Sequence, residues 1–372
     1  MSKNLIKTEK TTIPTGWELI QLGDIFDLTS GKTKPKDTQT DKQLPYPVFG
    51  GNGVLGYSSL YCNEDTRIII GRVGEKCGCI HWENGKCWVT DNALYIKKLK
   101  RQINQKYLFK VLGYLNLNKL KKEAGQPLIS QGIIYGIKFT CAPLPEQEKI
   151  VKVLETWDNY LEKLSEAIKL KKKIKKSLMQ KLLRCEVRLP GFNKLWETLE
   201  FSECFQVLGK KQGEKKTDYL EKGRFPIIDQ SQQKIAGYSN HEELVILKNL
   251  PLIIFGDHTR ILKIIEHQFV LGNDGTKVFH GKNGFDTKYL FYYLSLISIP
   301  NTGYNRHFKY LKDLSIHLPK DYQEQTAIAQ ILTTADQEIE TLEKKKAIIE
   351  QQKKFLLNNL ITGRIRLPEF TH

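Results

Sequence analysis

The chain contains two copies of one long sequence pattern. The first copy ends in Leu189-Pro190-Gly191-Phe192 and the second in Leu367-Pro368-Glu369-Phe370, an offset of 178 residues. The same offset relates Glu146-Gln147 to Glu324-Gln325. It also relates, without a gap, Ile150 to Ile328, Leu154 to Leu332, Asp158 to Asp336, Leu164 to Leu342, Leu178 to Leu356, Leu182 to Leu360 and Arg188 to Arg366. A repeat of this length predicts a pseudo-two-fold protein, suited to a partner that presents two separated sites.

Each copy opens with a segment that predicts a globular domain. Apolar runs bounded by Gly, Pro and Asn predict short strands. These runs are 48–49, 67–70 and 94–96 in copy one, and 225–228, 251–255 and 269–271 in copy two. The copies share echoes such as Lys106-Tyr107-Leu108-Phe109 and Lys288-Tyr289-Leu290-Phe291, but elsewhere they diverge. We therefore expect two α/β (α+β) domains with one fold and different surfaces.

Each copy closes with a segment that predicts a long helix. Apolar residues recur at alternating steps of four and three, a heptad seam. The seam comprises Ile150, Leu154, Trp157, Leu161, Leu164, Ile168, Leu178 and Leu182 in the first helix, and Ile328, Leu332, Ala335, Ile339, Leu342, Ile349, Leu356 and Leu360 in the second. Lysines interrupt both seams, at Lys171 and Lys175 and at Lys346 and Lys353. A first helix from Gln147 to Arg184 would be about 57 Å long, at about 1.5 Å per residue.

One helix cannot bury a seam this narrow by itself. The two helices are therefore expected to pair as an antiparallel coiled coil, and the alternative is that each docks on its own domain. The Leu-Pro pairs 144–145 and 318–319 are expected to mark the domain-to-helix junctions. The predicted organisation is 1–145 and 191–319 as globular domains, 146–190 and 320–372 as helical spacers.

Composition favours a folded protein with a polyanionic partner. The net charge is +17, and residues 1–190 hold 33 Lys and Arg against 19 Asp and Glu. Such an excess favours nucleic acid, although a merely soluble basic protein remains an alternative. The chain has no apolar stretch near the roughly 18 residues of a membrane helix. The first five residues lack a signal-peptide core, and seven irregularly spaced cysteines fit a reducing cytoplasm, so we expect a cytoplasmic protein.

The run 169–176 places six lysines in eight residues of the first helix. Two interpretations stay open: a solvated face, or a contact with phosphate or an acidic partner.

The chain shows no catalytic constellation. Gly31-Lys32-Thr33 lacks the first glycine of a phosphate-binding loop, where Phe26 stands, and Gly50-Gly51-Asn52-Gly53 predicts a turn. An Asn-Pro-Pro-aromatic tetrapeptide, the mark of amino-methyltransferases, does not occur. Cys77, Cys79 and Cys87 lack the usual zinc-knuckle spacing even with His81 added, so we expect neither a metal nor a cofactor.

The whole pattern resembles the specificity subunit of type I restriction-modification systems. The resemblance rests on Pro14-Thr15-Gly16-Trp17-Glu18, Leu144-Pro145-Glu146-Gln147-Glu148-Lys149-Ile150 and Gln323-Glu324-Gln325-Thr326-Ala327-Ile328-Ala329, and on the helix end 360–368. It covers nearly the whole chain. The first helix departs at its end, where Leu183-Arg184-Cys185-Glu186 stands in place of a Leu-Thr-Gly type ending that the second helix keeps as Ile361-Thr362-Gly363.

The resemblance implies a non-catalytic subunit with two target-recognition domains. Each domain would read one half of a bipartite site in double-stranded DNA, and the helices would set the spacing between the half-sites. The helices would also dock two methyltransferase subunits and, through them, nuclease-translocase subunits. A coiled-coil scaffold that reads no DNA is the alternative, and an autonomous nuclease or methyltransferase is disfavoured by the missing motifs.

Basic and amide side chains in the domain loops are the candidate DNA contacts, because arginine suits guanine and Asn or Gln suits adenine. A phosphate contact or a solvated side chain is the alternative for each. The candidates are Lys32, Lys34, Arg72, Lys76 and Gln131 in the first domain, and Lys210, Lys211, Arg260, Asn305, Arg306 and His307 in the second. The segment 304–308 is the favoured cluster, since it joins planar and hydrogen-bonding groups in one loop.

Overall fold

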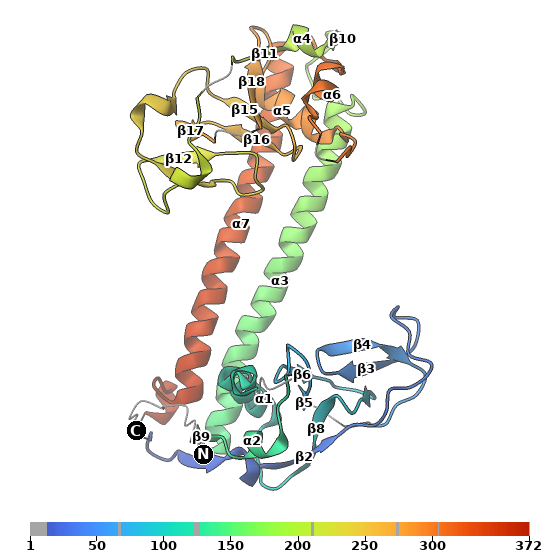
Figure 1. The fold of residues 1–372 in the computed structure, drawn as a ribbon, viewed down its shortest axis with the longest axis vertical. Helices are drawn as coiled ribbons and strands as arrows, with labels where there is room; N and C mark the ends of the chain where they lie inside the picture. The colour runs from blue at the N-terminus through green and yellow to red at the C-terminus, as the bar shows by residue number, and fades with distance from the viewer. Residues whose placement is uncertain are drawn as a thin grey trace. The chain divides into compact units, whose positions relative to one another are not determined.

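The computed structural model describes residues 13–65, 68–121, 127–209, 212–272, 275–303 and 305–371 (Figure 1). The chain divides into two compact units, Met1–Leu164 with Lys345–His372, and Ser165–Lys344. Each unit therefore combines one globular domain with part of each long helix. The boundaries expected near 145, 190 and 319 stay a prediction, and the compact units divide both helices part-way along.

The domain of the first unit is built from three small sheets and two short helices. β1 (Glu18–Gln21) pairs antiparallel with β9 (Lys138–Cys141), where α2 (Gln131–Tyr135) comes just before β9. The four-stranded sheet has the order β2 (Phe26–Ser30), β8 (Ala93–Leu99), β5 (Ile68–Gly71), β6 (Ile80–Trp82). The three-stranded sheet has the order β4 (Gly53–Ser58), β3 (Tyr46–Gly50), β7 (Trp88–Val89), and α1 is Gln105–Leu115.

The domain of the second unit repeats this plan, with one further strand, β14, in one of its sheets. β10 (Trp196–Glu200) pairs with β19 (Ser315–Pro319), as β1 pairs with β9. Its larger sheet has the order β11 (Phe205–Val207), β18 (Thr276–Gly281), β15 (Leu252–Gly256), β16 (Leu262–Ile265). The other sheet has the order β13 (Gly237–Ser239), β12 (Phe225–Ile228), β17 (Phe269–Leu271), β14 (Val245–Ile246). The helices α4 (Phe201–Cys204), α5 (Thr287–Leu296) and α6 (Phe308–Lys312) complete the domain. Two α+β domains of one fold confirm the expectation from the repeat.

The apolar runs of the sequence form β5 and β15, which lie inside their sheets and are buried along their whole length. Side chains of a strand point alternately to its two faces. Ile68 and Ile70 accordingly join the main core of the first unit, whereas Ile69 packs with Phe49 and Val89 under the three-stranded sheet. Both faces are covered, so the run is continuously apolar rather than alternating.

The Lys-Tyr-Leu-Phe echo marks the first turn of α1 and of α5. Asn104 Oδ1 accepts a hydrogen bond from Tyr107 N at 3.0 Å, and Asp286 Oδ1 accepts one from Tyr289 N at 2.8 Å. These N-caps satisfy a backbone donor that the helix leaves unpaired. Both tyrosine rings are fully buried, so the echo reflects one packing site used twice.

The long helices are α3 (Leu144–Leu183) and α7 (Tyr322–Thr362). α3 begins three residues before the expected Gln147 and includes Pro145 in its first turn, where a proline removes no helical hydrogen bond. The second Leu-Pro pair instead ends β19. The two pairs therefore differ in local structure, although each stands at or just before the start of a long helix.

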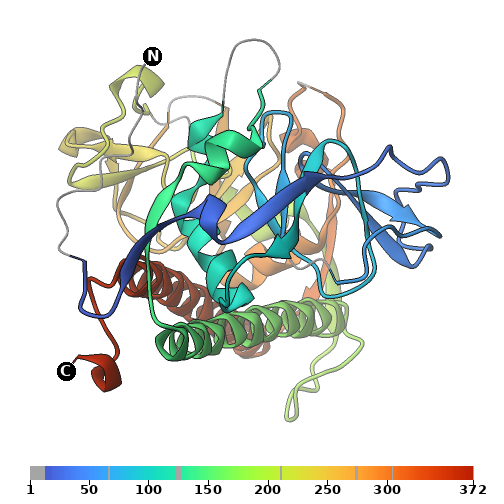
Figure 2. The ribbon, with the colours of Figure 1, turned by 90° about the horizontal axis from the view of Figure 1, so that it is seen from below.

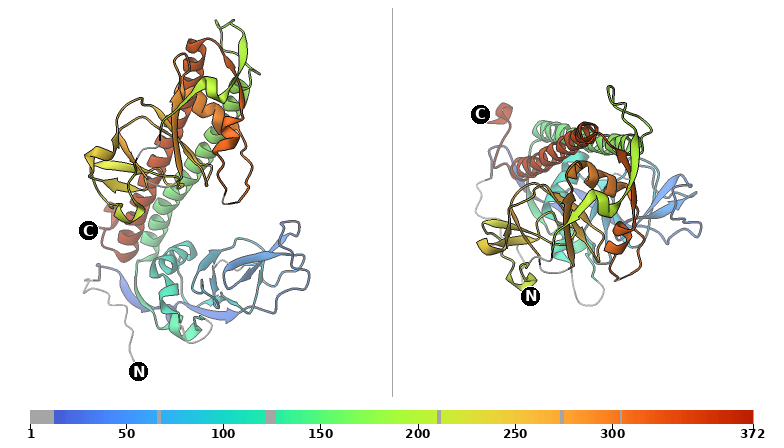
Figure 3. Two further views of the ribbon diagram at one scale, coloured as in Figure 1. Left: turned by 45° about the horizontal axis from the view of Figure 1, so that its top comes forward. Right: turned by 90° about the horizontal axis from the view of Figure 1, so that it is seen from above.

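α3 and α7 lie side by side and run in opposite directions (Figures 2 and 3). In the first unit the start of α3 shares a core with the end of α7, through Ile150, Leu154 and Leu360. In the second unit the end of α3 shares a core with the start of α7, through Leu182, Ile328 and Leu332. The expected antiparallel helix pair is confirmed. Within the described residues, no helix is both long and apolar enough to span a membrane.

Candidate nucleic-acid interface and helix junctions

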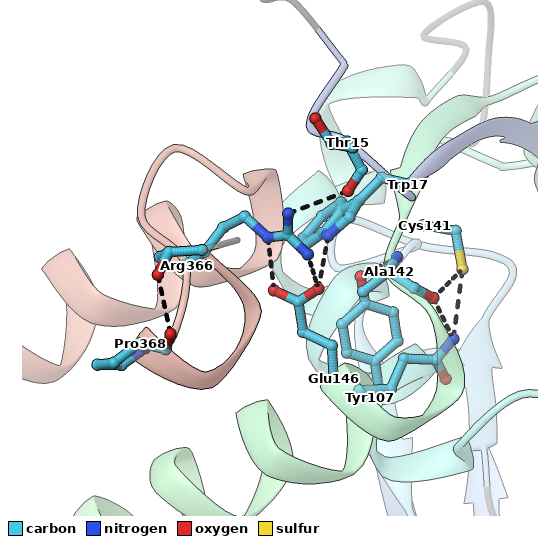
Figure 4. Close-up of polar contacts among 10 residues, drawn as sticks. Thr15, Trp17, Tyr107, Cys141, Ala142, Glu146, Arg366 and Pro368 are labelled. Carbon is cyan, nitrogen blue, oxygen red and sulfur yellow. Dashed lines mark hydrogen bonds and ion pairs between the residues drawn. The ribbon is translucent and has the colours of Figure 1, made fainter.

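A buried carboxylate joins the domain of the first unit to both long helices (Figure 4). Glu146, on the first turn of α3, is 1% exposed and accepts two hydrogen bonds from Arg366, Nε to Oε1 at 3.0 Å and Nη2 to Oε2 at 2.7 Å. Trp17 Nε1 donates to Glu146 Oε2 at 2.8 Å. Arg366 lies 220 residues away and follows the end of α7. A fork-to-fork ion pair of this kind fixes geometry as well as charge.

The second unit contains the same arrangement at the 178-residue offset. Arg188 Nε donates to Glu324 Oε1 at 3.0 Å and Arg188 Nη2 to Glu324 Oε2 at 2.7 Å. Trp196 Nε1 contacts Glu324 Oε1 at 3.4 Å. We call these two sites the Arg-Glu-Trp junctions. In each, the end of one repeat contacts the start of the helix of the other repeat.

The glutamine next to each buried glutamate attaches the helix to its domain. Gln147 Oε1 accepts from Asn104 N at 2.8 Å, and its Nε2 donates to Ala142 O at 2.7 Å. Gln325 makes the same pair of bonds, with Asp286 N at 2.8 Å and Pro319 O at 2.9 Å. Both glutamines are buried and contact the N-cap residue of α1 or α5, so the Glu-Gln repeat of the sequence is one structural device used twice.

An aspartate on each helix pairs with a lysine of the other helix. Asp158 accepts hydrogen bonds from Lys353 and from Lys110 of α1, the latter at 2.5 Å. Asp336 accepts one from Lys175 at 2.5 Å and one from Tyr292 Oη at 2.9 Å. Burial alone would raise the pKa of Asp158, but the two lysines outweigh it and hold that pKa below its usual value. The seam lysines 175 and 353 are thus partners of seam-flanking carboxylates.

The structure buries or half-buries every seam residue. Nine are buried: Ile150, Leu154, Leu164, Ile168, Leu182, Ile328, Leu332, Ile339 and Leu360. Seven are half-buried: Trp157, Leu161, Leu178, Ala335, Leu342, Ile349 and Leu356. Exposed apolar side chains of the helices lie off the seam, at Leu170, Ile174, Ile348 and Phe355.

Part of the lysine run 169–176 pairs with acidic residues of α7. Lys171 contacts Glu338 and Lys172 contacts Glu343, each at 2.6 Å, and Lys175 contacts Asp336. These three lysines thus pair with carboxylates of the chain itself, an arrangement that neither interpretation of the run included. Lys173 and Lys176 are exposed, as a solvated face would be.

Three connections of the first domain meet at one end of its sheets: the β3–β4 turn, the β5–β6 loop and the segment 127–131 before α2. Arg72 O accepts from Ile129 N at 2.9 Å, and Gly74 N donates to Pro127 O at 2.8 Å. The candidates Arg72, Lys76 and Gln131 lie on these joined segments. Lys76 is exposed and Gln131 half-buried.

Arg72 also links this face to the segment that carries the other two candidates. Its Nη1 donates to Ser30 Oγ at 3.1 Å. Lys32 and Lys34 follow Ser30 and are exposed. All five candidates of the first domain therefore lie on segments that contact one another directly or through Ser30.

The second domain joins the β15–β16 turn to the segment 299–307 before α6. Asp257 O accepts from His307 N and lies 2.9 Å from His307 Nδ1, while Asp257 Oδ1 accepts from Phe308 N at 2.8 Å. Arg260 Nη1 donates to Ile299 O at 3.1 Å. Asn305 and Arg306 are exposed just before His307, and Asn305 Nδ2 donates to Thr302 O.

His307 differs from the other candidates because it is fully buried. Its second ring nitrogen, Nε2, lies 3.3 Å from Thr302 Oγ1. We therefore replace its expected contact with DNA by an anchoring role for the loop. Lys210 and Lys211 lie outside the described residues.

A further polar turn, which the sequence reasoning missed, lies beside the β15–β16 turn. Thr259 Oγ1 donates to Gln230 O at 2.6 Å, in the connection 229–236 between β12 and β13. Its signal in the sequence is the amide-rich run Gln230-Ser231-Gln232-Gln233 directly after a strand.

The cysteine group considered for zinc is divided between two clusters. Cys77 belongs to the main core of the first unit, whereas Cys87 lies under the three-stranded sheet. Cys79 Sγ lies 3.2 Å from His81 Nε2, and burial raises the pKa of Cys87 to about 12. Over the described part of the chain, no group of three or more His, Cys, Asp or Glu could hold a metal ion.

Comparison with known proteins matches this architecture. The sequence profile of the type I restriction modification DNA specificity domain matches twice, at residues 14–176 and 193–351. A putative type I restriction enzyme specificity subunit of Methanocaldococcus jannaschii, MjaX, is 28% identical and covers 98% of this chain and 97% of its own length. A second subunit of that organism, MjaVIII, is 26% identical and covers 95% of this chain and 94% of its own length.

Solved structures share the fold at low sequence identity. The S subunit of a type I restriction-modification system from M. genitalium has a TM-score of 0.68 and 16% identity, and the match covers 93% of this chain and 96% of that one. A chain solved in work on complex assembly and conformational transition of the type I R-M system has a TM-score of 0.51 and 14% identity, covering 95% of this chain and all of that one. The two profile matches together span most of the sequence, so the chain belongs to the type I restriction modification DNA specificity family.

Proposed function

We propose that this chain is the DNA-recognition subunit of a type I restriction-modification complex, in which each globular domain reads one half of a bipartite target. The observation that carries the proposal is a contrast between copies. Two domains of one fold differ in the loops that present basic and amide side chains, while their junctions with the helices repeat the same contacts. Different loops suit different half-sites, and the excess of positive charge suits the phosphates that flank both.

The loop candidates divide into two proposed roles. The exposed Lys32, Lys34 and Lys76 suit phosphate contacts, which position a protein on DNA without reading sequence. Asn305 and Arg306 suit base edges, because they are exposed beside His307, which Asp257 holds in place. Arg72 and Arg260 each use part of their guanidinium on an internal acceptor, so they support the loops as well as adding charge.

The helices are the proposed spacer and docking surface. Their junctions recur in both units, as expected where two copies of one methyltransferase subunit bind. The exposed Leu170 and Ile348, related by the 178-residue offset, provide equivalent apolar points on α3 and α7. We assign the reaction itself to the partner subunits and the complex to the cytoplasm, as suits a member of the DNA specificity family.

Replacing residues 17–144 with the corresponding domain of another family member tests the proposal. The complex should then methylate a sequence altered in one half only, measured by methylome sequencing of cells that express the chain with its methyltransferase. A change in both halves, or in neither, would contradict separate reading by two domains. The purified chain with S-adenosylmethionine and DNA, but without the methyltransferase, should give no methylation.

The scaffold alternative predicts a different result in a binding assay. A scaffold would show no preference between the methylated sequence and a scrambled duplex of equal length at any salt concentration. A recognition subunit in complex with its methyltransferase should bind the methylated sequence at least about 10³-fold more tightly than scrambled DNA.

The spacer role has its own test. Inserting two heptads into each helix keeps the seam register and should lengthen the tolerated gap between half-sites. An unchanged gap would show that the helices do not set the spacing. A matched insertion of the same length after Thr371, outside the helix pair, should leave the gap unaltered.

A further inference from the structure

The second domain carries an extension at a place where the first has a tight turn. In the first domain only residues 51–52 separate β3 from β4. In the second, residues 229–236 separate β12 from β13, which are the equivalent strands. We call residues 229–236 the amide turn, because Gln230, Gln232 and Gln233 lie in it.

A buried lysine of β16, in the other sheet of the domain, holds the first residue and the middle of the amide turn. Lys263 Nζ, from β16, donates to Asp229 O at 2.8 Å and to Gln233 O at 2.6 Å. The Lys263 side chain is only 10% exposed, and its burial lowers its pKa. Its nearest carboxylate oxygen, Asp229 Oδ1, is 3.8 Å away. Burying an ammonium group is unfavourable unless it is hydrogen-bonded. The two carbonyl groups of the turn satisfy this ammonium group, and the lysine in return fixes their positions.

Three glycines form the surface on which the turn rests. A Cβ on Gly256 would lie 2.8 Å from Gln230 Cβ, and one on Gly272 would lie 2.6 Å from Asp229 Cβ. A Cβ on Gly275, where φ is +61°, would lie 2.7 Å from Gln230 Nε2. Contacts this short disfavour a side chain at Gly256 and Gly272, and the left-handed backbone disfavours one at Gly275. The start of the turn is therefore packed directly on backbone from three different strand ends.

The held turn presents two neighbouring amides to solvent. Gln232 and Gln233 are both exposed, and the turn contacts the β15–β16 turn that joins the loop of Asn305 and Arg306. A glutamine amide offers one donor and one acceptor, which match N7 and the N6 amino group of adenine in the major groove. A base reader needs its backbone fixed before binding, and Lys263 with the three glycines provides this.

We propose that the amide turn is a base-reading element of the second domain, in which Gln232 and Gln233 recognise adenine-containing base pairs and Lys263 is a positioning residue. This inference rests on the proposed function as a DNA-recognition subunit. The first domain, whose equivalent turn holds only Gly51 and Asn52, then reads its own half-site without such an element.

The test uses the complex of the chain with its methyltransferase and duplexes that carry the target found by methylome sequencing. Gln232→Ala with Gln233→Ala should weaken binding to that target about 10- to 100-fold, because a bidentate amide-adenine contact discriminates by about that factor. The variant should lose its preference for adenine over other bases only at positions of the half-site read by the second domain. Gln268→Ala, an exposed glutamine of the same domain away from the turn, is the matched control and should change nothing.

Replacing the adenines of that half-site one at a time with 7-deazaadenine removes the N7 acceptor. At the contacted position the native complex should bind the modified duplex more weakly than the unmodified one. The double variant should bind both duplexes equally. An equal loss in native and variant complexes at every position would overturn the proposal. So would a folded double variant with unchanged preference in that half-site.

Lys263→Met separates positioning from folding. It should lower the preference for the native second half-site over base-substituted ones at least tenfold, leave the first half-site preference intact and leave the salt dependence of binding unchanged, because Lys263 contacts no phosphate in this scheme. Lys263→Arg should restore part of the preference. Equal losses at both half-sites would mean that Lys263 is merely structural. If the native complex itself shows no sequence preference, the proposed function fails rather than the role of the turn.

Discussion

The helix junctions of the two units repeat the same contacts, whereas their loop faces differ in length and in side chains. Glu146 and Glu324 each bind an arginine at 2.7 Å and 3.0 Å, and Gln147 and Gln325 bind an N-cap amide at 2.8 Å in both units. The β3–β4 connection occupies 51–52, whereas the β12–β13 connection occupies 229–236. The repeated junctions suit identical partners, and the divergent loops suit different half-sites.

The largest expected effect tests whether the two junctions are equivalent. Glu146→Ala and Glu324→Ala each leave an arginine without its buried partner, and each should destabilise its own unit by about 3–5 kcal/mol. Native-state hydrogen exchange of peptides from each unit measures this, since unfolding of two units need not be a single transition. The exposed Glu338→Ala serves as control and should have an effect below about 1 kcal/mol. Strongly unequal losses would break the equivalence of the junctions.

The next test compares the buried His307, which holds the loop, with the exposed Arg306 beside it. His307→Ala removes a fully buried ring and should lower the free energy of unfolding of the second unit by about 1–3 kcal/mol. Arg306→Ala changes an exposed side chain, so stability should shift by less than about 0.5 kcal/mol. DNA affinity should instead fall by about 1–3 kcal/mol if Arg306 reads a base. If Arg306→Ala left the DNA affinity unaltered, Arg306 would not contact DNA.

Replacing the aspartate that pairs the helices should destabilise the first unit more than the second. Asp158→Asn weakens contacts with two lysines and should destabilise the first unit by about 1–2 kcal/mol. Asp336→Asn keeps a neutral partner in Tyr292 and should have a smaller effect. The pKa of Asp158 lies below its usual value of 3.8. Its contribution is therefore fully present above that pH and is lost as the pH falls further.

A pH series on the Asp158→Asn variant checks the sign of this linkage. The stability difference between native and variant first units should shrink below about pH 4, as Asp158 becomes protonated in the native protein. Hydrogen exchange or denaturant unfolding between pH 3 and 6 measures it. A difference that grows on acidification would mean that another group controls the helix pair.

The smallest expected effect concerns the ends of the two helices. Gly363, after α7, has φ of +69°, and Cys185 has φ of +59° at the same place after α3. The sequence departure at Cys185 thus leaves the left-handed backbone intact, although a side chain there costs about 1 kcal/mol. Cys185→Gly should stabilise the second unit by up to about 1 kcal/mol in denaturant unfolding. Gly363→Ala, whose Cβ would meet Trp17 and Pro14, should destabilise the first unit.

Local periodicity was enough to predict most of the fold. The heptad seam and the apolar runs of β5 and β15 are local patterns, so they can be read from the sequence. The offset of 178 residues can be read as well, because it only requires comparison of two segments. The echo at Tyr107 and Tyr289 could be seen in the sequence, and the structure shows that both tyrosines are buried in equivalent first helical turns. The Leu-Pro pairs did not distinguish a helix start from a strand end, because proline is compatible both with the first turn of α3 and with the end of β19.

Of the candidate site, the sequence determined residue types and the tertiary structure decided which of them act together. Arg72 and Arg306 could be named as basic loop residues, but His307 proved to be an anchor because its ring is buried against Asp257. The role of Lys263 depends on carbonyls 30 and 34 residues away. The repeat itself was visible in the sequence. The exchange of repeat ends, Arg366 with Glu146 and Arg188 with Glu324, needed the structure, since a buried ion pair depends on proximity in space and leaves no periodic trace along the chain.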